Sequence, residues 1–172
     1  IVNAITTVFL DRDGVINVDS PDYIKSWEAF HFIPKSVEAI ARLTRAGVAV
    51  IVITNQSAVN RGMISQQELE TMHRRMCRTV ADSGGRITDI FFCPHRPDEN
   101  CDCRKPRPGM ILRAAAEHGV DLSRSWMLGD QDRDALTGIS GFEGATGVLA
   151  CGPTGDCATG EALGIFVITD EE

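Results

Sequence analysis

Residues 6–14 read Thr-Thr-Val-Phe-Leu-Asp-Arg-Asp-Gly, an apolar run that ends abruptly in charged residues. A second apolar run, 48–53, ends in the polar residues Thr54-Asn55, and between the two runs apolar residues recur at helical spacing across 37–44. Gly47 supplies the stop after that helix. Because the second run is apolar throughout, we expect it to be a parallel strand covered on both faces of the sheet. This order predicts an α/β fold.

The alternation of strands and helices continues along the chain. Ser65, followed three residues later by Glu68, forms a capping-box pattern that opens a helix ending at Gly84-Gly85. Further elements are predicted as a strand at 89–92, a helix at 109–118, a strand at 126–128, and strands near 147–150 and 165–168. The irregular segment 93–108 separates the third strand from its following helix. We expect one central parallel sheet covered by helices.

Length and charge limit the possible functions. The chain has 172 residues, 17 Lys plus Arg and 24 Asp plus Glu, for a net charge of −7. This length suffices for one domain, 1–172, with its own core. The acidic balance argues against nucleic acid as a partner, and no apolar run approaches the roughly 18 residues that span a bilayer. We expect a cytoplasmic monomer without a membrane partner. A leader removed before Ile1 stays an open alternative.

Polar turns follow four of the predicted strands. In an open parallel sheet, ligands bind beyond the carboxyl ends of the strands, so these turns are expected to converge. They are Asp11-Arg12-Asp13-Gly14, Thr54-Asn55-Gln56-Ser57, Arg104-Lys105-Pro106, and Gly129-Asp130 with Asp134. Clustered carboxylates repel one another unless a divalent cation lies among them, and oxygen ligands favour Mg²⁺.

Each turn also has an ordinary interpretation when taken alone. Asp11 and Asp13 could belong to a common Asp-rich turn, in which Gly14 merely allows the backbone to bend. Thr54 and Asn55 offer groups that can cradle phosphate oxygens, but the same residues occur in plain turns. A lysine such as Lys105 is most often a solvated surface residue. The combination of all four turns is what favours a site.

The ordered motifs resemble the haloacid dehalogenase-like (HAD) superfamily. More closely, the stretches 9–17, 54–57 and 101–110, with Arg61-Gly62, resemble its heptose 1,7-bisphosphate phosphatases. The resemblance implies a Rossmann-like three-layer fold with a central parallel sheet. Larger members carry a cap domain after the first or third strand, and neither gap here is long enough for one. The resemblance therefore implies a small flap, about 15–33, and a zinc-binding loop, 93–103.

The resemblance also implies a two-step phosphoryl transfer. Asp11 would attack phosphorus to form an aspartyl-phosphate, and Asp13 would protonate the leaving oxygen and then activate water. Mg²⁺ would be held by Asp11, the main-chain carbonyl of Asp13, and Asp130. Thr54 and Lys105 would complete the catalytic set by holding the transferring oxygens.

Substrate contacts are implied by the same resemblance. Asp134 would lie behind the residues that contact the metal and the substrate, where it could orient Lys105. The predicted contacts to substrate are Asn55, Ser57, Arg61, Arg104 and Lys105, with Asp19, Tyr23 and Trp27 of the flap as further candidates. Arg104 suits a second phosphate because a guanidinium grips phosphate oxygens bidentately, unless it simply pairs with Asp102. Tyr23 and Trp27 could instead pack the flap onto the domain.

Three cysteines and one histidine gather in the third loop. Cys93, His95, Cys101 and Cys103 match the tetrahedral shell of a structural Zn²⁺ site. Disulfides are the competing interpretation, but cysteines two residues apart pair poorly. Elsewhere, Cys77 is expected to be a core thiol, and a bridge between Cys151 and Cys157 is disfavoured. The remaining histidines, His31, His73 and His118, are expected to be surface or packing residues.

The predicted function is therefore Mg²⁺-dependent hydrolysis of a small-molecule sugar phosphate. By resemblance, the substrate is D-glycero-D-manno-heptose 1,7-bisphosphate, converted to the 1-phosphate in nucleotide-heptose biosynthesis. Histidinol-phosphate phosphatases share the first motif and the zinc loop, but Asn17, Ser57 and Arg61 fit the heptose enzymes better. The sequence departs from them at Ala58 and Asn60, where glycine and alanine are usual. A zinc-stabilised binding module is the alternative from another class.

Overall fold

A computed structural model describes residues 5–141 and 147–149 of the chain. It contains a five-stranded sheet in the order β3-β2-β1-β4-β5. The strands are β1 (Thr7–Leu10), β2 (Ala49–Asn55), β3 (Asp89–Cys93), β4 (Ser125–Gly129) and β5 (Gly147–Leu149). Every neighbouring pair is parallel. The predicted α/β fold with a central parallel sheet is confirmed.

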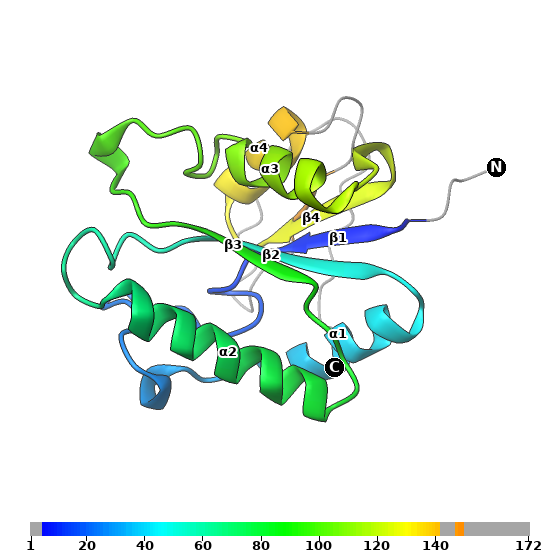
Figure 1. The fold of residues 1–172 in the computed structure, drawn as a ribbon, viewed down its shortest axis with the longest axis horizontal. Coiled ribbons are helices and arrows are strands. Elements are labelled where there is room, and N and C mark those ends of the chain that lie inside the picture. Colours follow the sequence, from blue (N-terminus) through cyan, green and yellow to red (C-terminus); the bar gives the residue numbers. More distant parts are fainter. Residues whose placement is uncertain (1–4, 142–146, 150–172) are drawn as a thin grey trace.

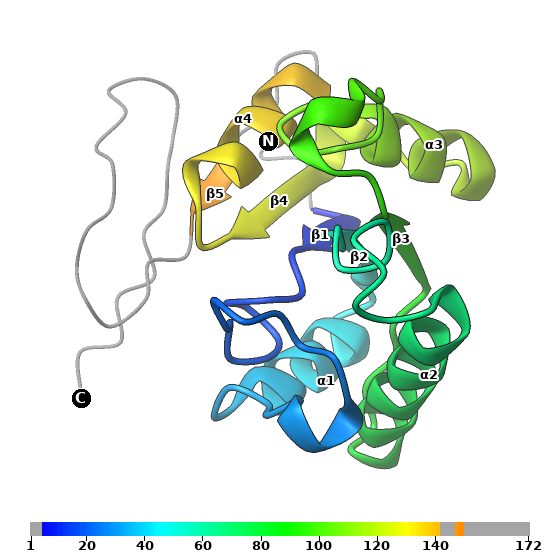
Figure 2. The ribbon, with the colours of Figure 1, turned by 90° about the vertical axis from the view of Figure 1, so that its left-hand side faces the viewer.

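Helices cover both faces of the sheet. Their bounds are α1 (Ser36–Arg45), α2 (Gln66–Asp82), α3 (Gly109–His118) and α4 (Asp132–Gly141), and three short 3₁₀ helices, η1 (Trp27–Ala29), η2 (Pro97–Glu99) and η3 (Leu122–Arg124), lie in the connections. Helices α1 and α2 lie on one side, and α3 and α4 on the other (Figures 1 and 2). The three predicted layers are therefore present. Helix α4 is absent from the sequence prediction, because its segment is poor in apolar residues and opens as an acidic turn.

The two central strands divide their side chains between two cores. On the side of α1 and α2, Val8, Leu10, Val50 and Val52 are buried. On the side of α3, Phe9, Ile51 and Ile53 are buried. Full burial of each such side chain contributes about 1.5 to 3 kcal/mol. The continuous apolar runs follow from burial on both faces of the sheet.

Helix α2 begins as its sequence predicts. The Ser65 hydroxyl accepts a hydrogen bond from the Glu68 backbone N–H at 3.2 Å, and the Ser65 N–H donates to the Glu68 carboxylate at 2.8 Å. This capping box satisfies two N–H groups that the helix leaves unpaired. The helix then buries one face, formed by Leu69, Met72, His73, Met76 and Val80.

Register brings the polar turns to one edge of the sheet. Leu10 pairs with Val52 on one side and with Leu128 on the other, so the residues that follow β1, β2 and β4 emerge together. The flap, the 56–64 loop and the 94–108 segment all extend from this edge, on the left of Figure 1. The fold thereby places the four turns side by side.

Some sequence predictions concern residues at or beyond the end of the described ranges. The strand predicted near 147–150 is present as β5. The strand predicted at 165–168 and the residues Cys151 and Cys157 lie outside the described residues. Within the described ranges, no helix combines the length and apolar character required to cross a membrane.

Candidate active site

Three carboxylates meet at the carboxyl edge of the sheet. Oxygens of Asp11, Asp130 and Asp134 lie within 4.8 Å of one another. Asp11 follows β1, Asp130 follows β4, and Asp134 lies in the first turn of α4. Asp11 is only 6% exposed and Asp134 is fully buried. The turns thus converge as the sequence predicts.

The Lys105 ammonium lies among these carboxylates. Its Nζ is 2.8 Å from Asp11 Oδ2 and 2.6 Å from Asp134 Oδ1. The Lys105 side chain is 1% exposed, so the surface-lysine interpretation is wrong. The Asp134 carboxylate therefore contacts the Lys105 ammonium directly, as the resemblance implies for a residue that orients this lysine.

Asn55 fixes the backbone that carries Lys105. Its Oδ1 accepts a hydrogen bond from the Lys105 N–H at 3.0 Å, and its Nδ2 donates to the Lys105 carbonyl at 3.2 Å. The side chain of Asn55 was expected to contact substrate, and in the structure it engages this peptide while also lining the cleft. The amide consequently links the end of β2 to the Lys105 loop.

The electrostatics of the carboxylate group indicate a cation site. Burial raises the pKa of Asp11 to about 6, although the neighbouring Lys105 opposes the rise. Burial and the nearby Asp11 raise the pKa of Asp130. Asp130 Oδ1 is buried without a hydrogen-bond partner. One ammonium cannot neutralise three carboxylates, so Asp11 and Asp130 fit a divalent cation such as Mg²⁺.

Asp13 is held apart from that group by its own set of donors. Its Oδ1 accepts from Arg12 Nε at 3.1 Å, Arg12 Nη2 at 2.8 Å and Asn17 Nδ2 at 2.9 Å. Its Oδ2 accepts from Gln56 Nε2 at 2.7 Å. Burial by itself would raise the pKa of Asp13, but Arg12 and these hydrogen bonds outweigh it and lower the pKa. Asp13 is thus an ionised carboxylate in a fixed orientation.

Gln56 also connects Asp13 to the end of β2. Its Nε2 donates to the buried Thr54 Oγ1 at 2.9 Å as well as to Asp13. Sequence reasoning assigned no role to Gln56 or Arg12. Their only signal was membership in the polar turns, because the Gln56–Asp13 contact spans 43 residues.

A cleft of about 320 Å³ opens beside these groups. Its wall includes predicted substrate contacts and flap residues together with one cation that was not predicted. These residues are Asp19, Tyr23, Ser57, Arg61, Arg104, Lys105 and, unpredicted, Arg133. The Arg61 guanidinium lies 5.9 Å from the centre of the Tyr23 ring. The structure therefore brings the flap and the 56–64 loop to the same opening.

Trp27 of the flap packs away from this cleft. Its ring stacks on Phe30 with centroids 5.1 Å apart and meets the edge of Phe32 at 6.2 Å. Arg75 of α2 lies over its face at 5.8 Å. The packing interpretation is therefore correct for Trp27, whereas Tyr23 lines the cleft.

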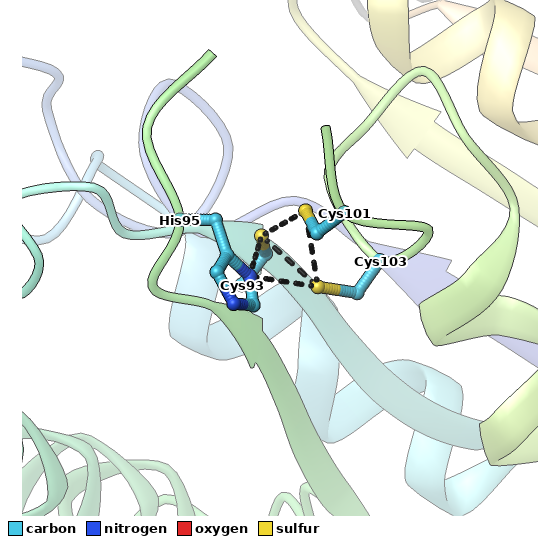
Figure 3. A group of neighbouring side chains, drawn as sticks. All are labelled: Cys93, His95, Cys101 and Cys103. Carbon is cyan, nitrogen blue, oxygen red and sulfur yellow. Dashed lines mark hydrogen bonds between the residues drawn. The ribbon is translucent and has the colours of Figure 1, made fainter. Parts of the chain in front are cut away.

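The four residues of the third loop gather into one group. Figure 3 shows the side chains of Cys93, His95, Cys101 and Cys103 pointing toward one another. Their sulfur atoms are separated by 3.2 to 3.5 Å, and His95 Nδ1 lies 3.3 Å from Cys103 Sγ and 3.4 Å from Cys93 Sγ. A disulfide has a sulfur separation of about 2.05 Å, so these three cysteines are unbridged. The spacing is close to the edges of a tetrahedral zinc shell.

Arg104 joins this loop to the cleft. Its Nη1 donates to the His95 carbonyl at 3.0 Å. Among the described ion pairs there is none between Arg104 and Asp102, so the simple pairing interpretation is wrong. Arg104 is instead held at the cleft wall by the backbone of the third loop.

Comparisons with known proteins agree on one group of enzymes. A family model described as HAD-hydrolase-like matches residues 102–150. The chain is 52% identical over 127 residues to a D-glycero-beta-D-manno-heptose-1,7-bisphosphate 7-phosphatase of Pseudomonas aeruginosa, covering 74% of this chain and 71% of the relative. The enzyme of the same name from Yersinia pestis is 35% identical, and the match covers 96% of this chain and 90% of the relative.

A solved structure shares both fold and sequence. The D,D-heptose 1,7-bisphosphate phosphatase of B. bronchiseptica, complexed with magnesium and phosphate, superposes with a TM-score of 0.80 at 40% identity. The match covers 84% of this chain and 80% of the other. A putative HAD-like phosphatase from Mesorhizobium loti gives a TM-score of 0.83 at 31% identity, covering 97% and 81%.

Gly14 provides a test of the cation site. Its φ is +84°, and an added Cβ would collide with the Asp130 carboxylate. Gly14→Ala should therefore displace Asp130 and weaken Mg²⁺ binding by roughly tenfold or more, as measured by isothermal titration calorimetry. Gly47→Ala is the matched control, because its φ is +75° and nothing lies within 4 Å of the added Cβ. Equal Mg²⁺ affinity in both variants would contradict the site.

Proposed function

Because the chain belongs to the D-glycero-beta-D-manno-heptose-1,7-bisphosphate 7-phosphatase family of HAD-like hydrolases, we propose that it removes the 7-phosphate of that sugar bisphosphate. The observation that carries the proposal is the buried group formed by Asp11, Lys105 and Asp130, with Asp13 held beside it. A zinc-stabilised binding module would have no need of an ammonium buried among carboxylates.

The first step of the proposed reaction uses both aspartates of the first turn. The Asp11 carboxylate attacks phosphorus, the bond from phosphorus to the sugar oxygen breaks, and an aspartyl-phosphate forms. Asp13, which is ionised in the free site, takes up a proton from the phosphate monoester or from solvent as substrate binds and passes it to the departing oxygen. In the second step Asp13 takes a proton from water, whose oxygen attacks phosphorus and releases Asp11 with inorganic phosphate. Asp13 is hydrogen-bonded on both oxygens, which supports a fixed position for these transfers.

The remaining groups of the site stabilise charge. We assign Asp11, the main-chain carbonyl of Asp13, and Asp130 to a Mg²⁺ ion, which when bound neutralises the negative phosphoryl oxygens. Lys105 supplies a second positive charge at 2.8 Å from Asp11. Thr54 is assigned to the same oxygens because its hydroxyl lies at the end of β2 and hydrogen-bonds to Gln56.

The charge of the cleft supports a substrate with two phosphates. Arg61, Arg104, Arg133 and Lys105 all line it, which places cations beyond the single ammonium that faces Asp11. We propose that Arg104 contacts the phosphate that is retained, and that Ser57 and Arg61 contact the sugar side. Eight relatives at 35 to 53% identity carry the name heptose-1,7-bisphosphate 7-phosphatase, and this favours the heptose substrate over histidinol phosphate.

We also propose a structural Zn²⁺ in the third loop. Three thiolates and one imidazole would fill all four positions, leaving no place for a reacting water. Burial raises the pKa of the Cys93 thiol, so a bound cation would be needed to hold it as a thiolate. The loop runs directly into Arg104 and Lys105 and thereby supports both.

The residues that we assign to catalysis and to the two metal ions all lie in the described part of one chain. The flap (15–33) and the zinc loop (93–103) border the same cleft, so we propose one catalytic domain acting as a monomer. A net charge of −7 supports a small sugar phosphate as substrate in place of nucleic acid, and we place the reaction in the cytoplasm.

Asp11→Asn should abolish the proposed reaction while preserving the fold. The amide has nearly the same shape but is not a nucleophile, so phosphate release from heptose 1,7-bisphosphate should fall at least about a thousandfold. Asp22→Asn, an exposed flap residue outside the cleft, serves as control and should keep normal turnover. Retained turnover in the Asp11 variant would refute the aspartyl-phosphate mechanism.

Cys101→Ser should reduce bound zinc below one ion per chain and lower the thermal midpoint. Closed zinc sites contribute directly to the free energy of folding, so the loss of one ligand should lower both the affinity for zinc and the stability of the fold. Metal analysis of the purified protein and a melting curve measure these effects. Cys77→Ser, a half-buried thiol on α2, is the control and should keep its zinc. A wild-type protein that lacks zinc and is freely alkylated at its loop cysteines would disprove the site.

Arg104→Ala should impair recognition of the bisphosphate more than the chemistry. Losing one charge-assisted contact of about 1.5 to 3 kcal/mol should lower kcat/KM about ten- to a hundredfold, mainly through KM. Hydrolysis of an aryl phosphate should change much less. Arg107→Ala is the control, since Arg107 contacts the Cys101 carbonyl outside the catalytic cleft. Equal losses on both substrates would favour histidinol phosphate again.

A further inference from the structure

We propose that His73 of α2 is a positioning residue for Asp13 and acts through the guanidinium of Arg12. The inference rests on the proposed function, because it concerns the proton that Asp13 delivers to the leaving sugar oxygen. His73 belongs to none of the polar turns and was expected to be a surface or packing residue. In the structure, His31 is exposed and His118 pairs with Asp89 at the surface, whereas His73 is buried.

The contact between His73 and Arg12 lies fully inside the protein. Arg12 Nη1 is 3.1 Å from His73 Nε2, and the two residues are 0% and 6% exposed. A guanidinium only donates hydrogen bonds, so His73 Nε2 must be the acceptor and the ring proton must lie on Nδ1. Burial and the Arg12 charge lower the pKa of His73 to about 3, so the ring is neutral at ordinary pH.

Two other nitrogens of Arg12 donate hydrogen bonds to Asp13. Nε and Nη2 reach the same oxygen, Asp13 Oδ1, at 3.1 and 2.8 Å, while Nη1 points to His73. The planar guanidinium is thus fixed at both ends. Without an acceptor at residue 73, a buried N–H of Arg12 would be unpaired, and the plane would turn to find another partner. Asp13 Oδ1 would turn with it.

Aromatic rings support the same geometry. The Arg12 guanidinium lies 5.7 Å from the centre of the Phe30 ring, and the His73 ring meets the edge of Phe92 at 6.0 Å. Phe30 comes from the segment after η1 and Phe92 from β3. Phe30 therefore packs against Arg12 directly, and Phe92 packs against the His73 ring that contacts Arg12.

The consequence for chemistry depends on the leaving group. A sugar alkoxide needs a proton as the bond to phosphorus breaks, whereas a nitrophenolate leaves as a stable anion. The ratio kcat/KM includes only the steps up to aspartyl-phosphate formation, so it reports this proton transfer separately from the later hydrolysis. A misplaced Asp13 should therefore lower kcat/KM for the sugar bisphosphate far more than for an aryl phosphate.

The test compares His73→Leu with His73→Gln on heptose 1,7-bisphosphate and p-nitrophenyl phosphate. Leucine fills the volume without an acceptor, while the glutamine oxygen can accept from Arg12. For His73→Leu we expect kcat/KM to fall at least about tenfold more for the bisphosphate than for the aryl phosphate. His73→Gln should restore most of that difference. Met76→Leu, a buried change on the same helix, should leave the ratio of the two substrates as in the wild type.

Three results would overturn the inference: equal losses on both substrates, no loss in His73→Leu, or a glutamine variant as selective in its loss as leucine. If His73→Leu does not fold, Arg12→Lys takes its place, because one ammonium cannot reach both partners as the fork does. The same difference between substrates is then expected, and its absence overturns the inference. A wild-type protein inactive on both substrates would overturn the proposed function as well, whereas an active one without the difference overturns this inference alone.

Discussion

The ion pairs of Lys105 with Asp11 and Asp134 are the interactions on which the rest of the site depends. Taking these charges out of water costs on the order of several kcal/mol per ion, and only close geometry offsets that cost. Nζ lies within 2.8 Å of both carboxylates. Asn55 then fixes the backbone of Lys105 from β2, and the third loop carries the residue to the edge of the sheet. Removing the Lys105 ammonium would leave the two carboxylates buried without the cation that both contact.

The fold and the main site groups were predictable because their signals are local. Apolar runs such as 48–53 predict strands that are buried on both faces, and the pair Ser65 and Glu68 predicts the start of α2. The proximity of Asp11, Asp130 and Asp134 could be predicted, since parallel strands place their carboxyl ends at the same edge of the sheet. Cys101 and Cys103 were readable as metal ligands because residues two apart rarely form a disulfide with each other.

Other contacts could not be predicted because their partners are distant in sequence. Gln56 reaches Asp13 across 43 residues, and His73 reaches Arg12 across 61. Neither residue has a spacing that marks it, and a histidine on an apolar helix face is usually a packing residue. Helix α4 was missed because its first turn is acidic and its apolar residues are sparse, although negative charge suits a helix N-terminus. Arg133 was missed with it.

The position of β1 at the centre of the sheet has a consequence for the order of assembly. The strand is made first, yet it pairs with β4, and Thr6 donates a hydrogen bond to the Arg124 carbonyl 118 residues later. Contacts of such high sequence separation require closure of long loops and form slowly. During synthesis, Asp11 therefore emerges long before Lys105, Asp130 and Asp134. A chain truncated before Lys105 would therefore carry Asp11, the proposed nucleophile, without the groups that surround it in the folded protein.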